Sequence, residues 1–145
     1  MSKSTIILDS SVIAKWFFPE KNSDMALRIK EKFAESRLSI AVPILLYYEV
    51  SNILKTATKL VRINPNAASK AYQGFLNLNF IAYSTANLMA NTLEIALKYD
   101  ISSYDASYIA LAEYLQVPFF TADQKLINKV TSKYIFKLEN YKLEN

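Results

Sequence analysis

The chain has 145 residues, of which 52% are hydrophobic and 21% charged, and this suits one folded domain over residues 1–145. It contains no cysteine, no histidine and one glycine, which excludes disulfides, thiolate or imidazole zinc sites, Ser-His-Asp triads and glycine-rich phosphate loops. The net charge is +4, from 17 Lys and Arg against 13 Asp and Glu, and a basic surface around a small acidic site suits a polyanionic partner.

The pattern of apolar residues predicts five short strands separated by helices. In chain order we first expect a strand at 5–8, a helix from Ser10 that ends before Pro19, a helix capped by Asn22 or Ser23 that runs through Phe33, and a strand at 38–42. Helices at 43–60 and 66–79, a strand at 80–83 and helices at 86–99 and 103–115 follow. The last elements are a strand at 118–121, a helix at 123–130 and a strand at 134–138. Strands that alternate with helices predict an α/β fold, with a parallel sheet covered by helices on both faces.

No segment of the sequence has the pattern of a membrane span or a secretory signal. The longest apolar run, Ile40–Tyr48, has nine residues, which is too short to cross a bilayer. The first residues lead directly into a four-residue strand rather than into the apolar core of a signal peptide. We therefore expect a soluble, cytoplasmic protein with no membrane partner.

Two aspartates lie just after predicted strands. Asp9 comes after Ile6-Ile7-Leu8, and Asp123 comes after the strand that ends at Thr121. Each aspartate also precedes a predicted helix, so an ordinary helix N-cap is an alternative for either one. The carboxyl ends of parallel strands are where α/β sheets bind ligands, and two such acids would share one crevice if their strands were neighbours.

Glu49 is the most unusual acid, because it lies in the middle of a helix beside an apolar stripe that includes Leu46, Val50 and Ile53. Burying an unpaired carboxylate costs on the order of several kcal/mol, so Glu49 needs a partner. A salt bridge to Lys or Arg is the ordinary explanation, and a metal ion is the alternative.

Asp105 opens the helix at 103–115 and lies next to the face that carries Tyr108 and Ile109. A first-turn acid is also favoured by the helix dipole, so Asp105 alone would not indicate a site. The remaining acids lie on charged or solvated faces.

These four acids, in this order and context, resemble the PIN-domain family, and in particular the toxin ribonucleases of VapBC-type toxin–antitoxin pairs. The matching segments are Ile7-Leu8-Asp9-Ser10-Ser11, residues 43–52 around Glu49, residues 104–112 from Tyr104-Asp105-Ala106, and Thr121-Ala122-Asp123. The resemblance spans nearly the whole chain, and no acid of the family pattern is missing.

The resemblance implies a central parallel five-stranded sheet in the order 3-2-1-4-5, which makes the strands before Asp9 and Asp123 neighbours. It also implies a metal-dependent endoribonuclease that hydrolyses RNA to 3′-hydroxyl and 5′-phosphate ends. The expected partners are RNA, a VapB-like antitoxin that blocks the site, and a second copy of the chain in a homodimer.

The chemistry of carboxylates without imidazole or thiolate favours a hard ion, Mg²⁺ or Mn²⁺, which takes oxygen ligands and keeps several waters. We assign Asp9, Glu49, Asp105 and Asp123 as catalytic, metal-binding acids, with Asp9 and Asp105 touching the first ion and Glu49 or Asp123 acting through water. Ser10 and Thr121 are candidates to hydrogen-bond these acids or a substrate phosphate, although each also suits a turn or a cap.

Three other functions compete with this one. A non-catalytic RNA-binding or scaffold PIN domain would not need all four acids. A phospho-receiver domain needs a second acid after the first strand and an acceptor aspartate after the third, where this chain has Ser10 and Tyr83-Ser84, and it is set aside. A DNA nuclease of related fold remains an alternative, but it usually needs more acids and a longer chain.

Overall fold

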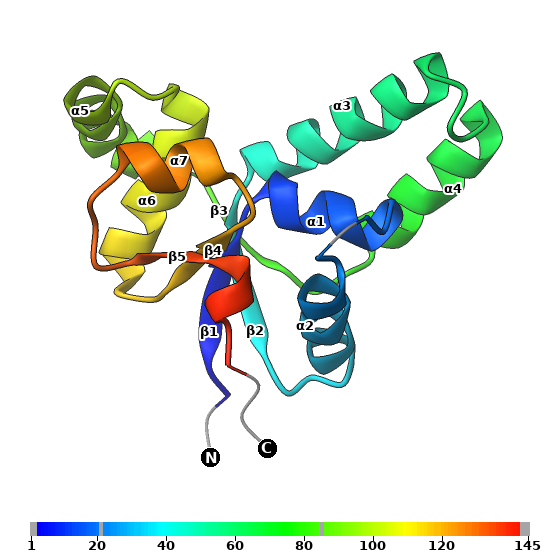
Figure 1. The fold of residues 1–145 in the computed structure, drawn as a ribbon, viewed down its shortest axis with the longest axis horizontal. Coiled ribbons are helices and arrows are strands. Elements are labelled where there is room, and N and C mark those ends of the chain that lie inside the picture. The colour runs from blue at the N-terminus through cyan, green and yellow to red at the C-terminus, as the bar shows by residue number, and fades with distance from the viewer. Residues whose placement is uncertain (1–2, 21, 85, 143–145) are drawn as a thin grey trace.

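The computed structural model describes residues 3–20, 22–84 and 86–142, which form a five-stranded parallel sheet with helices on both faces (Figure 1). The strands are β1 (Thr5–Leu8), β2 (Ser39–Pro43), β3 (Ile81–Tyr83), β4 (Phe119–Thr121) and β5 (Ile135–Lys137). The helices are α1 (Ser10–Phe17), α2 (Asp24–Ala34), α3 (Leu45–Lys59), α4 (Pro65–Leu76), α5 (Met89–Tyr99), α6 (Ser103–Leu115) and α7 (Gln124–Lys129), with short 3₁₀ turns η1 (Ala86–Leu88) and η2 (Leu138–Asn140).

The strand order is β3-β2-β1-β4-β5, and every pairing is parallel. This confirms the PIN-like α/β fold and the order 3-2-1-4-5 that the resemblance implies. Because β1 pairs with β2 on one side and β4 on the other, the chain reverses its winding direction between β1 and β4. Ligands of such sheets bind at this switch point, outside the carboxyl ends of the strands.

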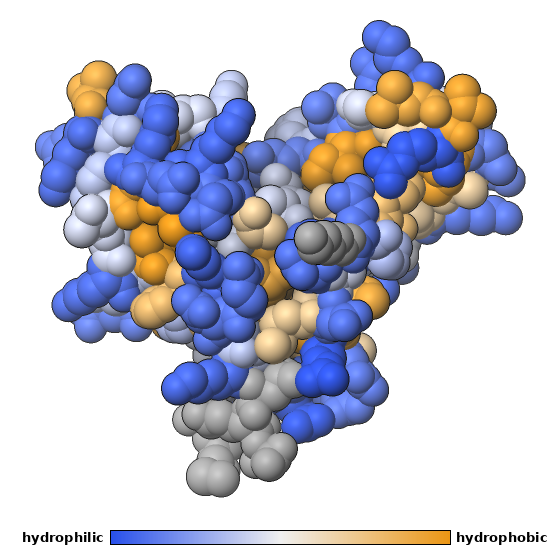
Figure 2. Space-filling model, in the orientation of Figure 1, coloured by the Kyte–Doolittle hydropathy of each residue, from blue (hydrophilic) through white to orange (hydrophobic). Residues whose placement is uncertain are grey.

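The two faces of the sheet carry separate hydrophobic clusters, because successive strand residues point to opposite faces. Ile6 and Leu8 of β1 pack with residues of α1 to α4. Ile7 of the same strand packs on the other face with residues of α5, α6 and α7. Figure 1 shows these two groups of helices as separate arms, α3 and α4 on the right and α5 to α7 on the left, and the start of α1 lies between them. In Figure 2 the surface is hollowed between these arms.

The elements differ from the expected ones mainly at their ends. Pro43 was expected in the first turn of a helix, but it is the last residue of β2 and pairs with Tyr83. The amide of Ile44 still donates to the carbonyl of Tyr83 over 3.0 Å, so the helix starts only at Leu45. The helix expected at 86–99 begins as the 3₁₀ turn η1, because Leu88, which precedes α5, has no side chain able to cap it.

None of the helices in the described ranges is both long and apolar enough to cross a membrane.

Candidate active site

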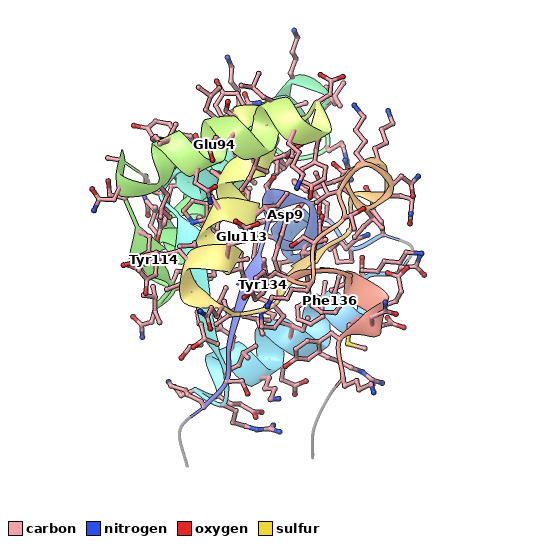
Figure 3. All side chains as sticks on the ribbon, turned by 90° about the vertical axis from the view of Figure 1, so that its left-hand side faces the viewer. Asp9, Glu94, Glu113, Tyr114, Tyr134 and Phe136 are labelled. Atoms are coloured by element: carbon pink, nitrogen blue, oxygen red, sulfur yellow. The ribbon has the colours of Figure 1, made fainter. Side chains whose placement is uncertain are left out.

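Asp9 lies where β1 ends and α1 begins, in a buried position (Figure 3). Its Oδ1 accepts hydrogen bonds from the amide of Ser11 at 3.1 Å, the hydroxyl of Ser11 at 2.5 Å and the amide of Val12 at 3.3 Å. Asp9 is therefore the N-cap of α1, as the ordinary alternative proposed. Its second oxygen, Oδ2, is not used in this cap, so capping does not account for the whole side chain.

Thr121, the last residue of β4, accounts for that second oxygen. Its hydroxyl donates to Oδ2 of Asp9 over 2.5 Å and accepts the amide of Asp123 at 3.0 Å. The hydroxyl of Ser11 lies 3.3 Å from the same Thr121 oxygen and accepts the amide of Ala122. These bonds join the two strand-end acids into one network across the switch point.

Glu49 projects from α3 toward α6. Its Oε1 accepts a hydrogen bond of 2.5 Å from the hydroxyl of Tyr108, and its carboxylate also interacts with the side chain of Ser10. Neither of the two ion pairs in the described part of the chain, Arg37–Glu35 and Arg62–Glu20, includes Glu49. Hydroxyl groups of Tyr108 and Ser10 therefore contact the Glu49 carboxylate, and neither of these ion pairs neutralises its charge.

The other two predicted site acids, Asp105 and Asp123, belong to the arm formed by α5 to α7. Asp105 lies in the first turn of α6, where its amide donates to the hydroxyl of the N-cap residue Ser102 at 3.1 Å. Asp123 is the N-cap of α7 and accepts the amide of Leu126 at 3.2 Å. Both side chains are half-buried and lie within electrostatic range of each other.

The pKa values show that the acids interact in a chain. Burial raises the pKa of Asp9 from 3.8 to about 6, against the lowering effect of its hydrogen bonds, and the charge of Glu49 adds to the rise. Burial and the charge of Asp105 raise the pKa of Glu49. Burial and the charge of Asp123 raise the pKa of Asp105. Each neighbouring pair therefore carries like-charge repulsion that a cation would relieve.

The donor set fits a hard divalent ion that keeps part of its water shell. Carboxylate oxygens are the ligands that Mg²⁺ and Mn²⁺ prefer, and Mg²⁺ is commonly held by only one or two of them. Over residues 3–20, 22–84 and 86–142 no three Asp or Glu side chains lie close enough to form a compact metal cluster. The arrangement therefore suits one or two direct carboxylate ligands, with the other acids contacting the ion through water.

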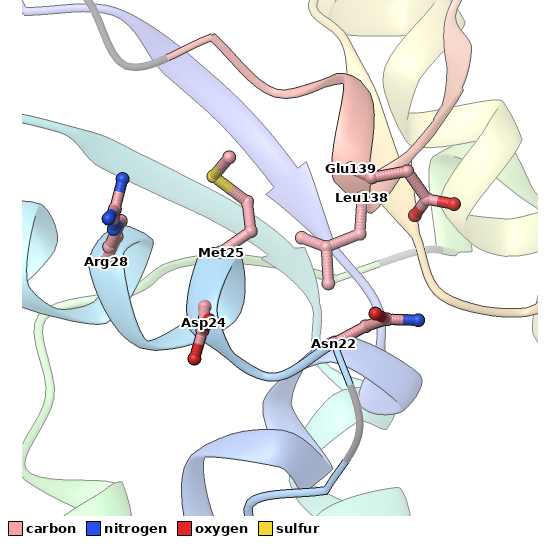
Figure 4. A pocket seen from close by; sticks show the side chains of 6 residues that line it. All are labelled: Asn22, Asp24, Met25, Arg28, Leu138 and Glu139. Atoms are coloured by element: carbon pink, nitrogen blue, oxygen red, sulfur yellow. The ribbon is translucent and has the colours of Figure 1, made fainter.

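A separate cavity of 380 Å³ lies between the start of α2 and η2 (Figure 4). It is lined by Asn22, Asp24, Met25, Arg28, Leu138 and Glu139. None of the four predicted acids is among the residues that line it. It is therefore not the site that the sequence predicts.

Sequence reasoning missed two residues that hold the acids. Ser11 was noted only as part of a motif, yet it contacts Asp9, Thr121 and Ala122. Tyr108 is predicted only to share a helix face with Ile109 beside Asp105, yet its hydroxyl donates to Glu49. A signal existed for Ser11, because a serine two residues after an Asp cap often closes an Asx turn. For Tyr108 the spacing of three from Asp105 placed both on one helix face, which is the only hint that the sequence contains.

Comparison with known proteins agrees with this architecture. A family model described as PIN domain matches residues 6–131. Ribonuclease VapC3 from Pyrobaculum aerophilum is 30% identical over 129 residues, which covers 86% of this chain and 93% of that protein.

Two solved structures have a similar fold. PAE2754 from Pyrobaculum aerophilum superposes with a TM-score of 0.67 at 25% identity, covering 96% of this chain and 93% of that one. VapBC2 from Rickettsia felis, bound to a DNA fragment from its promoter, gives a TM-score of 0.63 at 14% identity, covering 86% of this chain and 92% of that one, a likeness of fold alone. With the family model and the 30% identity to a ribonuclease, these matches show that the chain belongs to the PIN-domain family and is similar to its VapC members.

Proposed function

We propose that this protein is a metal-dependent endoribonuclease that hydrolyses RNA phosphodiester bonds and acts as the toxin of a VapBC-type toxin–antitoxin pair. The observation that carries the proposal is the chain of acids with raised pKa values, Asp9, Glu49 and Asp105, at the switch point of the sheet. Perturbed carboxyl pKa values in such a crevice are typical of functional sites. The identity to Ribonuclease VapC3 supports the reaction class.

We propose the following roles for the four acids. Asp9 and Asp105 hold the Mg²⁺ or Mn²⁺ ion directly, and Glu49 and Asp123 hold it through water or orient the attacking water. Such an ion, when bound, would supply an acidified water and would neutralise charge on the phosphate. Thr121 and Ser11 keep the Asp9 carboxylate in place through the hydrogen bonds described above. Ser10, beside Glu49, is placed to meet either the acid or a substrate phosphate.

The proposed substrate is RNA, cut to leave 3′-hydroxyl and 5′-phosphate ends. The net charge of +4 includes all 13 acids of the chain. If the four site acids are set apart, the rest of the chain is more basic than this total, and a basic surface attracts the RNA backbone. RNA cleavage by a toxin places the activity in the cytoplasm.

The proposed protein partners are a VapB-like antitoxin and a second copy of the chain. Solved relatives include a toxin–antitoxin complex from Klebsiella pneumoniae, at 14% identity, besides the VapBC2 structure. A homodimer is supported by helix α5, which lies at the outside of the left arm (Figure 1). Met89, Leu93 and Leu97 follow each other at one-turn spacing on it and are 46%, 54% and 74% exposed. Such an apolar stripe on a helix at the rim suits an interface between like copies.

Cleavage of a labelled RNA with and without divalent ions tests the central proposal. We expect cleavage of single-stranded or loop RNA with Mg²⁺ or Mn²⁺ and none in EDTA. Asp9→Asn and Asp105→Asn should each lower turnover by at least about 10²-fold, the effect of losing one electrostatic catalytic group. Undiminished cleavage in EDTA would contradict the metal mechanism.

The alternative of a non-catalytic RNA-binding PIN domain predicts a different result in the same experiment. Wild type would bind RNA but leave it intact under every metal condition, and calorimetry would detect no Mn²⁺ binding. The toxin role has its own test, which is co-expression with the product of the neighbouring reading frame. We expect wild type alone to arrest growth, and the neighbouring product or Asp9→Asn to restore it.

A further inference from the structure

Tyr108 is a core residue whose hydroxyl reaches the proposed site. Its side chain is only 1% exposed, and its ring stacks on Phe119 of β4, with centroids 5.5 Å apart and planes at 17°. The hydroxyl donates to Oε1 of Glu49 over 2.5 Å. A phenylalanine would make the same ring contacts, so packing in the core does not account for the hydroxyl.

The bond between Tyr108 and Glu49 joins the two arms of the molecule. Glu49 belongs to α3, whereas Tyr108 belongs to α6 and lies one helical turn after Asp105, on the same face of that helix. A single hydrogen bond therefore connects the helix that carries Glu49 to the helix that carries Asp105. The two carboxylates are in electrostatic range of each other, so their separation determines how both can meet one cation.

We propose that Tyr108 is a positioning residue for the divalent-cation site. Its hydroxyl fixes the rotation of the Glu49 carboxylate and the separation of Glu49 from Asp105 before any ion arrives. This inference rests on the proposed metal-dependent function and adds to it a residue that is neither an acid nor a ligand. Groups that orient the ligands of a metal typically change its affinity about 10–100-fold when they are removed.

The test compares Tyr108→Phe with wild type and with Tyr114→Phe by calorimetric titration of metal-free protein with Mn²⁺. Tyr114 lies on the same helix but is 65% exposed, so its variant is the matched control. Tyr108→Phe should raise the Mn²⁺ dissociation constant about 10–100-fold, and Tyr114→Phe should leave it within about twofold. Because the phenylalanine keeps the ring stack on Phe119, far-ultraviolet circular dichroism should be unchanged.

A double variant separates positioning from packing. If Tyr108 acts through Glu49, then Tyr108→Phe added to Glu49→Ala should change the Mn²⁺ affinity by less than about twofold, because the acceptor of the hydroxyl is already gone. If the two substitutions instead multiply their separate effects on the Mn²⁺ dissociation constant, Tyr108 acts on the site through packing. That result would overturn the inference.

The outcomes also distinguish this inference from the proposed function. If wild type cleaves RNA and Tyr108→Phe binds Mn²⁺ as tightly as wild type does, the positioning role of Tyr108 is overturned and the proposed function stands. If wild type binds Mn²⁺ and Tyr108→Phe binds it more weakly as expected, but wild type cleaves no RNA, the proposed nuclease is overturned. The positioning role of Tyr108 is then still supported. Wild type that binds no Mn²⁺ overturns both.

Discussion

The hydroxyl of Thr121 donates to Oδ2 of Asp9 over 2.5 Å, although 112 positions separate the two residues in the chain. The contact follows from the parallel pairing of β1 with β4, in which Leu8 lies opposite Phe120. The next residue of each strand then stands at the carboxyl edge of the sheet. Since Thr121 also accepts the amide of Asp123, one hydroxyl connects the strand-end acids.

The first prediction concerns this hydroxyl. Thr121→Val keeps the branched shape but removes the donor to a buried carboxylate, and hydrogen bonds to charged groups contribute about 1.5–3 kcal/mol. We expect a loss of stability of that order in thermal unfolding and a fall in RNA cleavage, because Asp9 loses the contact that fixes its second oxygen. Thr56→Val, at an exposed position of α3, is the control and should change neither. Full activity in Thr121→Val would show that the Ser11 and Val12 contacts suffice to hold Asp9.

The second prediction is a pH dependence of the metal-free protein. The pKa of Asp9 is raised from 3.8 to about 6 in the folded state, chiefly by burial. Between about pH 4 and pH 6 the folded state thus binds more protons than the unfolded state, and the free energy of unfolding falls as pH rises through this range. Two pKa units correspond to about 3 kcal/mol at most.

Asp9→Asn isolates this contribution. An asparagine retains the helix cap and carries no charge, so this variant should be more stable than wild type at pH 7 without metal. Its free energy of unfolding should also change less between pH 4 and pH 6. Part of the fall with rising pH should persist, because the pKa values of Glu49 and Asp105 are also raised in the folded state. Denaturant unfolding at a series of pH values in EDTA measures both effects. An Asp9→Asn variant less stable than wild type at pH 7 would mean that the Asp9 charge is stabilising.

The sheet and its acids could be predicted because their signals are local. The strand at 5–8 and the helix at 103–115 have the predicted bounds, since an apolar run and a capped helix are marked by neighbouring residues. The placement of Asp9 and Asp123 at strand ends followed from the same runs. The strand order came from the family resemblance, because local patterns do not specify which strands pair.

What the sequence could not supply is the set of long-range partners. The bond from Tyr108 to Glu49 spans 59 positions, and that from Thr121 to Asp9 spans 112. Such contacts depend on how α6 and β4 pack beside α3 and β1. The end of β2 at Pro43 was missed for a related reason, since pairing with β3 outweighs the preference of proline for the first turn of a helix.

The third prediction concerns the exposed stripe of α5. If Met89, Leu93 and Leu97 lie in a homodimer interface, light scattering at micromolar concentration should give twice the chain mass of 16.5 kDa. Leu93→Lys should shift the protein to monomer, because a charge would be buried without a partner. Leu60→Lys, at a position that is 63% exposed outside this stripe, should remain a dimer. A wild-type mass of one chain would contradict the dimer, and a dimeric Leu93→Lys would place the interface elsewhere.

The fourth prediction distinguishes a cation site from mere helix caps. At about 100 times its dissociation constant, a ligand of the folded state stabilises it by about 2.7 kcal/mol, which for a chain of this size corresponds to roughly 5–10 °C in Tm. We expect Mn²⁺ to raise the Tm of wild type by this amount. Asp123→Asn should keep the cap on α7, because the asparagine oxygen can accept the amide of Leu126 as Asp123 does. Its Tm without metal should therefore stay near that of wild type, while most of the Mn²⁺ shift disappears.

Asp100→Asn is the matched control for this experiment, because Asp100 is an exposed acid in the left-handed conformation after α5, which asparagine also tolerates. It should retain the full Mn²⁺ shift. If Asp123 serves only as a cap, Asp123→Asn will keep the shift as well, and the cation must then be held without that carboxylate. If Mn²⁺ leaves even the wild-type Tm unchanged, the acids hold no divalent ion and the metal-dependent nuclease is contradicted. Thermal shifts of wild type, Asp123→Asn and Asp100→Asn, with and without Mn²⁺, thus show whether Asp123 is a cation ligand or only a helix cap. They also show whether the protein has a metal site at all.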